Sequence, residues 1–489
     1  MNWSFNMCIL LVFQHVLPCR TTFNKELDRN YTAMEIELKK TIDEQQYMST
    51  TTDIWTAHNK TFLGVTVHWI DSETLQRNKA AIACRRFRGW HTYDAVASEL
   101  EDIFPQYGLI AEKVTACVTD NGSNFVKVFK EYQQVESAED EEEVEEDDGE
   151  VAFTDLQSVL TEGYDEDAQQ GMCVLPAHYR CAAHTLNLIA TNEIAKWLAS
   201  NQESRAVYRS STAKCSALWT KASRSTVASE CLEKISERKL IVPSVTRWNS
   251  FYDAYVRIIE MQLTDINNLC TQLQVKCMHD REYQFLKEYC SILKPFSIAL
   301  DILQGEETCF YGTLQPTLEV LMAKTLAMFH KCLAKLSQMI TGLSEIIVGA
   351  IKTRFATTID SKEALLATVS LPKFKLRWVK EETRRDHIKY LLTTECRSLT
   401  VEEPATPMID ARQPAVVTSL MESLHEFPRI KKIALRYNAP TPSSAPVERL
   451  FSLGSLVLTP RCNRLGDGRF QHLILMRFNR YFSQGGIME

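Results

Sequence analysis

The fold is decided by three consecutive stretches near the start of the chain: STTTDIWTA (49–57), TFLGVTVHWID (61–71) and QRNKAAIACRRF (76–87). The first is rich in threonine and β-branched residues. The second alternates, so that Phe62 and Leu63 begin two sets of side chains on opposite faces. A period of two predicts β-strands, and the short links between the runs predict an antiparallel meander.

The segments that flank this meander change to a helical period. Residues 17–48 predict one helix, because their apolar residues recur at spacings of three and four: Leu27, Tyr31, Met34, Leu38 and Ile42. Residues 91–107 predict a second helix that ends at Gly108. KVTACVTDNGS (113–123) predicts a fourth strand, followed by a helix and a further strand.

The order β-β-β-α-β-α-β is that of an RNase H-like domain, and a long helical region follows it. We therefore expect an α+β / α protein in which an RNase H-like domain is interrupted by a large all-α insertion. The expected parts are a helical lead-in or linker at 1–48, the first RNase H-like part at 49–190, the inserted helical domain at 191–435 and a terminal part at 436–489. Residues 136–170 are expected to be a disordered acidic insertion, since a block of like charge repels itself and buries nothing.

Composition excludes several classes of protein. The 489 residues are 45% hydrophobic and 24% charged, which argues against wholesale disorder, collagen and a multi-span membrane protein. The net charge of −7 is located mainly in one place, because residues 136–175 carry sixteen acids and no lysine or arginine. The remainder carries +9, so the body of the protein is mildly basic and compatible with a polyanionic partner.

The cysteines bear on the compartment. There are fifteen, spread from Cys8 to Cys462 without dense pairing, which favours reduced thiols in the nucleus or cytosol. The apolar run MCILLVF (7–13) offers an alternative, a short signal segment, but no lysine or arginine precedes it. It is also too short to span a bilayer, so no membrane partner is expected.

Three acidic residues lie at positions from which their carboxylates could bind a metal ion. Asp53 lies in the first predicted strand, Asp120 ends the fourth, and Glu448 opens the terminal helix. Carboxylates are the hard ligands that Mg²⁺ or Mn²⁺ prefers, and two such ions can activate a water or a 3′-hydroxyl for attack on a phosphodiester. Each acid also has an ordinary interpretation, because Asp before Asn-Gly suits a turn and Glu in a first helical turn suits a cap.

Six segments in sequence order carry a family resemblance. They are STTTDIWT (49–56), TDNGSNF (119–125), RCAAHTLNL (180–188), VTRWNSFYDAYVRI (245–258), LKPFSIALDILQGEETCFYGTLQPTLEVL (293–321) and PSSAPVERLFSLGSLVLTPRCNRLGDGRFQHLILMRFN (442–479). Together they resemble the transposases of the hAT superfamily, the DDE-type cut-and-paste enzymes. The last segment resembles the family's C-terminal dimerisation region.

The resemblance implies a catalytic, metal-binding triad of Asp53, Asp120 and Glu448 with a two-metal site for Mg²⁺ or Mn²⁺. It further implies DNA cleavage and strand transfer, a nuclear location, and a homodimer or higher oligomer that holds two DNA ends. Trp248 would stack on an extruded or distorted base, and Arg247 would reach a phosphate beside it. The alternatives are an indole packed between domains and an arginine paired with a carboxylate.

Residues 173–184 contain two cysteines and two histidines. The resemblance makes Cys181 and His184 supports of the active site without zinc. The spacing C-x4-H-x2-C-x2-H also offers four possible zinc ligands, although it matches no usual finger: Cys173, His178, Cys181 and His184. A structural zinc is therefore not expected.

The sequence departs from the family in ways that leave two classes of function open. Nothing resembles the BED-type zinc finger that many members carry before the catalytic domain, and Cys8 and Cys19 have no partners at ligand spacing. The intact triad favours a metal-dependent transposase. The missing finger favours a catalytically inactive, domesticated nuclear protein, similar to the zinc finger BED domain-containing proteins, that acts as a dimerisation, chromatin-binding or DNA-binding module.

Overall fold

The computed structural model describes most of the chain, namely residues 19–89, 92–132, 175–224, 230, 235, 238–243, 248–332, 340, 342–399, 420–459 and 465–483. The chain divides into two compact units. The first, here called the sheet unit, combines Met1–Tyr179 with Ser444–Glu489, and the second, the helical unit, is Arg180–Ser443. The acidic segment expected to be disordered, residues 136–170, lies outside the described residues.

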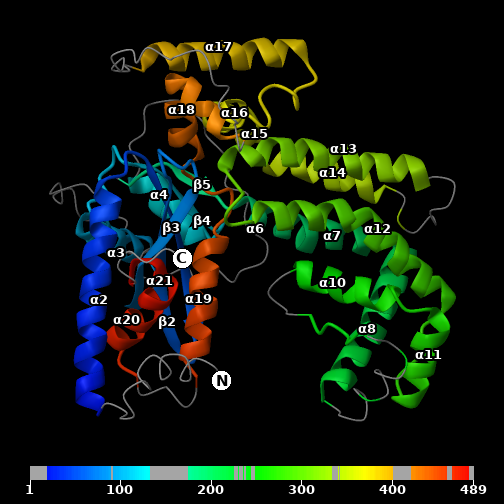
Figure 1. Cartoon of the computed structure of the whole chain (residues 1–489). Coiled ribbons are helices and arrows are strands. Elements are labelled where there is room, and N and C mark those ends of the chain that lie inside the picture. The colour runs from blue at the N-terminus through cyan, green and yellow to red at the C-terminus, as the bar shows by residue number, and fades with distance from the viewer. Residues whose placement is uncertain are drawn as a thin grey trace, which may run out of the picture. The chain divides into compact units, whose positions relative to one another are not determined.

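The sheet unit contains a five-stranded sheet and the helices that pack with it (Figure 1). Its elements are α2 (Arg20–Asp43), β1 (Met48–Ala57), β2 (Lys60–Ile70), β3 (Arg77–Phe87), α3 (Tyr93–Gln106), β4 (Val114–Thr119), α4 (Ser123–Tyr132), β5 (His178–Arg180), α19 (Ala445–Val457), α20 (Asp467–Phe478) and α21 (Arg480–Ser483).

The predicted meander is confirmed. β1 pairs antiparallel with β2, and β2 pairs antiparallel with β3. β4 then adds to the other side of β1 in the parallel sense, which gives the order β3-β2-β1-β4-β5. A parallel neighbour for β1 requires the chain to cross over between β3 and β4, and α3 makes that crossover. The mixed α+β class expected from the sequence is thus present.

The helix expected within residues 17–48 is α2, and its predicted apolar face is the buried face. Met34, Leu38 and Ile42 of this face belong to the same hydrophobic core as the sheet. The side chain of Lys113, next to β4, also donates to the carbonyl oxygen of Asp43 at the end of α2 over 3.0 Å. The lead-in is therefore part of the sheet unit's core.

The C-terminal helices complete this core. The Phe470 ring of α20 lies 4.6 Å from the Phe62 ring, and Ile474 is fully buried. Asn479 accepts from the Ala81 amide over 2.8 Å and donates to the Ala81 carbonyl over 2.7 Å. Because β3 is an edge strand of the sheet, these two bonds satisfy backbone groups that would otherwise lack partners. Part of the surface expected to mediate dimerisation is thus intramolecular core.

The helical unit agrees with the helical period of the sequence. Its elements are α6 (Ala182–Leu188), a π-helical turn η1 (Ile189–Glu193), α7 (Ile194–Ser200), α8 (Gln202–Arg224), α10 (Trp248–Ile259), α11 (Leu263–Gln272), α12 (Asp280–Leu303), η2 (Tyr311–Thr313), α13 (Leu314–Cys332), α14 (Leu343–Arg354), α15 (Ala356–Asp360), α16 (Lys362–Ser370), α17 (Glu382–Ser398), η3 (Glu422–Glu426) and α18 (Pro428–Asn438). Within the described ranges, no helix combines the length and the apolar character needed to cross a bilayer.

The boundaries of the helical unit differ by about ten residues from the 191–435 that the sequence suggested. The reason is that the two ends of the unit are tied to it. The Ala182 amide donates to the Pro442 carbonyl over 2.9 Å, and the Ser443 hydroxyl donates to the Leu303 carbonyl over 2.9 Å. These two hydrogen bonds hold Ala182, Pro442 and Ser443, which the sequence pattern had assigned to the neighbouring domain, within the helical unit.

Candidate functional site

Strand pairing relates the first two candidate acids to each other. In the parallel ladder between β1 and β4, Thr51 pairs with Val118. The ladder ends at this pair, and Asp53 lies two residues further along β1 while Asp120 is the first residue after β4. The two acids therefore lie toward the same end of the β1–β4 pair, and both side chains are half-buried.

The third acid lies on a helix that packs against the same part of the sheet. Asp53 pairs with Gly64 across the β1–β2 ladder. A Cβ atom at Gly64 would stand 2.5 Å from the Phe451 ring and 2.8 Å from the Val447 side chain, so only glycine admits α19 at this distance. Since Val447 and Phe451 flank Glu448 on α19, the first turn of this helix lies beside the strand pair that carries Asp53. A glycine inside a strand was the signal for this close approach.

The end of β4 carries the turn that the Asp-Asn-Gly sequence suggested, and it is also held by contacts of His178 that the sequence did not predict. Asp120 accepts from the Gly122 amide over 3.0 Å, which forms a turn within the Asp-Asn-Gly sequence. The Thr119 hydroxyl donates to the Asp120 carbonyl and lies 2.8 Å from Nε2 of His178. The His178 imidazole in turn stacks on the Phe129 ring with a centroid distance of 4.6 Å. His178, weighed from the sequence as a zinc ligand, thus fixes the backbone at Asp120.

The donor chemistry of the three acids suits a hard divalent cation, because carboxylate oxygens are the ligands that Mg²⁺ and Mn²⁺ prefer. Among the described residues, however, no three His, Cys, Asp or Glu side chains are grouped as a ready-made metal site. Side-chain rotation would have to bring Asp53, Asp120 and Glu448 closer together. Their half-buried positions leave each of them accessible to solvent for such a change.

Of the two residues predicted to contact DNA, Arg247 and Trp248, the structure describes one. Arg247 lies outside the described residues, and Trp248 is the first residue of α10. The next residue, Asn249, makes two side-chain hydrogen bonds to α12. Its amide donates to Asp301 over 2.9 Å and accepts from the Ser297 hydroxyl over 2.7 Å. The segment that carries Trp248 is therefore attached to α12 through Asn249.

Cys181 and His184 lie at the beginning of α6. Cys181 is fully buried, and its sulfur accepts from the backbone amide of His184 over 3.3 Å as the N-cap of the helix. This contact accounts for the cysteine structurally. Cys173, the other cysteine of the possible zinc pattern, lies outside the described residues. Support of the active site by Cys181 and His184 remains a prediction.

A basic turn in the helical unit was also missed. Between α16 and α17 the sequence KFKLRWVK places four exposed cations within residues 373–380: Lys373, Lys375, Arg377 and Lys380. The turn is anchored by Trp378, whose indole N–H donates to the Lys375 carbonyl over 3.1 Å. The Arg384 guanidinium lies 5.2 Å from the centre of the same ring. In the described part of the chain, no ion pair involves any of the four exposed cations.

Comparisons with known proteins find similarity over part of the chain. Residues 51–142 match the model of the ZBED1 RNase-like domain, a range that includes Asp53 and Asp120. The chain is 30% identical over 213 residues to the putative AC transposase of Zea mays, which covers 43% of this chain and 22% of that protein. It is 29% identical over 213 residues to the putative AC9 transposase of the same species, covering 43% and 21%. The match thus spans about a fifth of the length of these relatives, and over that stretch the chain is similar to these transposases.

Proposed function

We propose that the protein is a hAT-type transposase, or a protein derived from one, that cleaves DNA strands and transfers them in a metal-dependent reaction. The observation that carries the proposal is the register of the sheet unit. It supports the proposal because Asp53 and Asp120 lie toward the same end of the β1–β4 pair, while Gly64 admits the helix that carries Glu448 next to the strand of Asp53. Similarity to the two maize transposases supports the same class of reaction.

In this proposal Asp53, Asp120 and Glu448 hold two Mg²⁺ or Mn²⁺ ions. Bound there, the ions would activate a water or a 3′-hydroxyl and neutralise charge on the scissile phosphate. The protein's own contribution is positional. Thr119 and His178 hold the backbone at Asp120, and the packing of α19 fixes the height of Glu448 above the sheet.

The proposed substrate is DNA, and the working location is the nucleus. Trp248 would stack on an unpaired base, because a π-face holds a base without reading its identity, and Arg247 would contact a phosphate. The basic turn 373–380 supports this choice of ligand, since its four exposed cations can contact phosphates and its side chains include two aromatic rings. Binding by this turn would depend strongly on salt.

The experiment is a cleavage assay on the full chain with pre-nicked, end-exposed duplex DNA at low salt, with Mn²⁺ or Mg²⁺. Replacing Asp120 with asparagine keeps the side chain's shape and removes its charge, so metal-dependent cleavage should be lost while circular dichroism is unchanged. Asp53→Asn and Glu448→Gln should behave alike. Asp386→Asn, at an exposed residue of α17 in the helical unit, is the matched control and should cleave like the parent.

The outcomes separate the two classes of function. Cleavage that survives all three substitutions would refute the triad. A folded protein that binds DNA in a salt-dependent way but never cleaves it would favour the domesticated DNA-binding or chromatin-binding module. Dimerisation through the C-terminal region is proposed as well, and sedimentation of the same samples with and without DNA measures it.

A further inference from the structure

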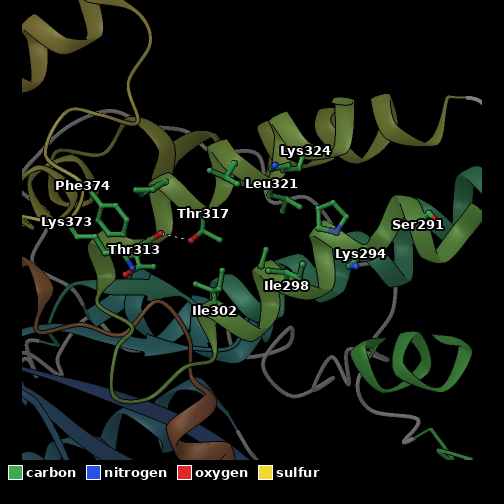
Figure 2. A pocket seen from close by; sticks show the side chains of 14 residues that line it. Ser291, Lys294, Ile298, Ile302, Thr313, Thr317, Leu321, Lys324, Lys373 and Phe374 are labelled. Atoms are coloured by element: carbon green, nitrogen blue, oxygen red, sulfur yellow. Dashed lines mark hydrogen bonds between the residues drawn. The ribbon is translucent and has the colours of Figure 1, made fainter. Parts of the chain in front are cut away.

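An open apolar cavity of about 450 Å³ lies between α12 and α13 of the helical unit (Figure 2). It is separate in sequence from the carboxylates and from the segment that carries Trp248. One wall comes from α12, where Ile298 and Ile302 stand one turn apart, and the other from α13, where Val320 and Leu321 face them. The aromatic ring of Phe374, from the basic turn, closes one end.

The walls of the groove expose large aliphatic side chains to solvent. Ile298, Ile302 and Val320 are 49%, 44% and 56% exposed, although all three are large aliphatic side chains. Beneath them Leu321 is 2% exposed, so the floor is packed and the groove is a formed surface. Contiguous exposed apolar side chains framed by polar residues mark sites of protein interaction.

The charges around the groove have one sign. Lys294, Lys324 and Lys373 line it, and none of the described residues that line it is an aspartate or a glutamate. None of the ion pairs among the described residues includes any of these three lysines. On the same helices Glu319 pairs with Arg384, whereas Asp301 accepts a hydrogen bond from the neutral Asn249 amide and keeps its charge outside the lining. The groove therefore presents an apolar strip whose lining charges are lysines.

The dimensions indicate the shape of an occupant. The α12 wall runs from Ser291 to Ile302, about 16 Å at 1.5 Å per residue, which is the length of three helical turns. A helix that lies in a groove of this length inserts side chains at positions i, i+3 or i+4, and i+7. DNA does not fit these walls as well, because its backbone offers phosphates and sugars, which contact cations but do not cover aliphatic side chains.

From these observations we infer that the groove between α12 and α13 is a docking site for an acidic amphipathic helix of a partner protein. The apolar side chains of that helix lie on Ile298, Ile302 and Val320. Its carboxylates face Lys294, Lys324 and Lys373 along the rim. This inference does not depend on the proposed cleavage reaction, because the groove shares no residue with the triad, although Lys373 and Phe374 also belong to the basic turn proposed to contact DNA.

The test is a selection from a displayed library of random 16-residue peptides on the full-length chain. Peptides that also bind an Ile298→Asp variant are removed. The enriched peptides should carry a net negative charge and three apolar residues at the spacing i, i+3 or i+4, i+7. Fluorescence anisotropy with the best peptide should show at least tenfold weaker binding to Ile298→Asp and to Val320→Glu.

Two controls make the result specific. Ile346→Asp makes the same change at an aliphatic residue that is 40% exposed on α14, outside the groove, and should bind like the parent. The triple variant Lys294→Glu, Lys324→Glu, Lys373→Glu should lose the acidic peptide and gain a copy whose acids are replaced by lysines. This exchange of preference would not follow from a folding defect.

The inference is overturned if no such motif is enriched, or if the enriched peptides bind the groove variants as well as the parent. It is also overturned if a 20-base-pair duplex, and no peptide, shows affinity that depends on Ile298 together with the three lysines. That outcome would assign the groove to nucleic acid. If the Asp120→Asn variant loses DNA cleavage but still binds the peptide, the inference is supported. The same holds if the parent binds the peptide and cleaves no DNA.

Discussion

Replacing Gly64 with alanine should disturb the sheet unit at the point where the candidate site is assembled. The new methyl carbon would stand 2.5 Å and 2.6 Å from two carbons of the Phe451 ring, and 2.8 Å from Cγ2 of Val447. Ordinary contacts of this kind measure 3.4–4 Å. Relief therefore requires α19 to retreat by about 1 Å, since the Phe451 ring is buried and stacks on Trp55.

The expected magnitude follows from this displacement. Inserting a methyl group into a packed interior costs about 1–3 kcal/mol of folding free energy. Because Glu448 moves with α19 while Asp53 stays in the sheet, a shift of about 1 Å should also lower any cleavage activity by about 100-fold. Urea denaturation followed by circular dichroism measures the first effect. Hydrogen exchange of peptides that cover α19 locates it without requiring activity.

A matched control and a compensating change sharpen the test. At Gly349 of α14 an added Cβ meets nothing within 4 Å, so Gly349→Ala should be neutral or stabilise by up to about 1 kcal/mol. Phe451→Leu removes the two ring carbons that clash with the new methyl group. The double variant with Gly64→Ala should therefore be more stable than the sum of the single changes implies. If Gly64→Ala matches the parent in stability and exchange, α19 does not approach the sheet as described, and the argument for Glu448 fails.

Three further predictions concern the interior and the basic turn. Asn479→Ala should destabilise the protein by about 3 kcal/mol in urea, because it leaves a buried amide and a buried carbonyl of edge strand β3 without partners; an unchanged midpoint would contradict this. Burial opposes ionisation of Glu282, but the hydrogen bond from Lys214 helps to hold its pKa below the ordinary value. A lowered folded-state pKa stabilises the protein above the unfolded-state pKa, and this stabilisation is lost as the pH falls below about 4.3. Lys214→Met should lower the free energy of unfolding by about 3 kcal/mol at pH 7, and it should weaken the loss of stability at acid pH. If the stability–pH curve of the variant ran parallel to that of the parent, the Lys214–Glu282 pair would not be the cause of the acid dependence. Glutamine at the three cations of residues 375–380 should reduce the slope of log affinity for DNA against log salt by about 2 to 3, as measured by anisotropy; an unchanged slope would remove the turn from the DNA contacts.

Much of the sheet unit could be predicted from sequence because its signals are local. The threonine-rich first run, the alternating second run and the short third run predicted β1, β2 and β3, and the spacing of three and four identified the buried face of α2 residue by residue. Local signals also placed Asp53 in a strand, Asp120 at a strand end and Glu448 in a first helical turn. For these residues the determining interactions lie within one turn or one strand, so the pattern of neighbours contains them.

The tertiary structure alone decided what depends on residues distant in the chain. That Asp53 and Asp120 lie toward the same end of two neighbouring strands follows from the parallel pairing of β1 with β4, which no local pattern encodes. The position of α19 depends on the absence of a side chain at Gly64, nearly four hundred residues earlier. The roles of His178 and Asn479 likewise come from partners in other elements. The groove between α12 and α13 has the same origin, since the helical period cannot tell an apolar residue that faces a core from one that faces an open cavity. Sequence thus determined which elements form, and packing between distant elements determined which side chains meet, because the energy of a close contact depends on position in space and not on separation along the chain.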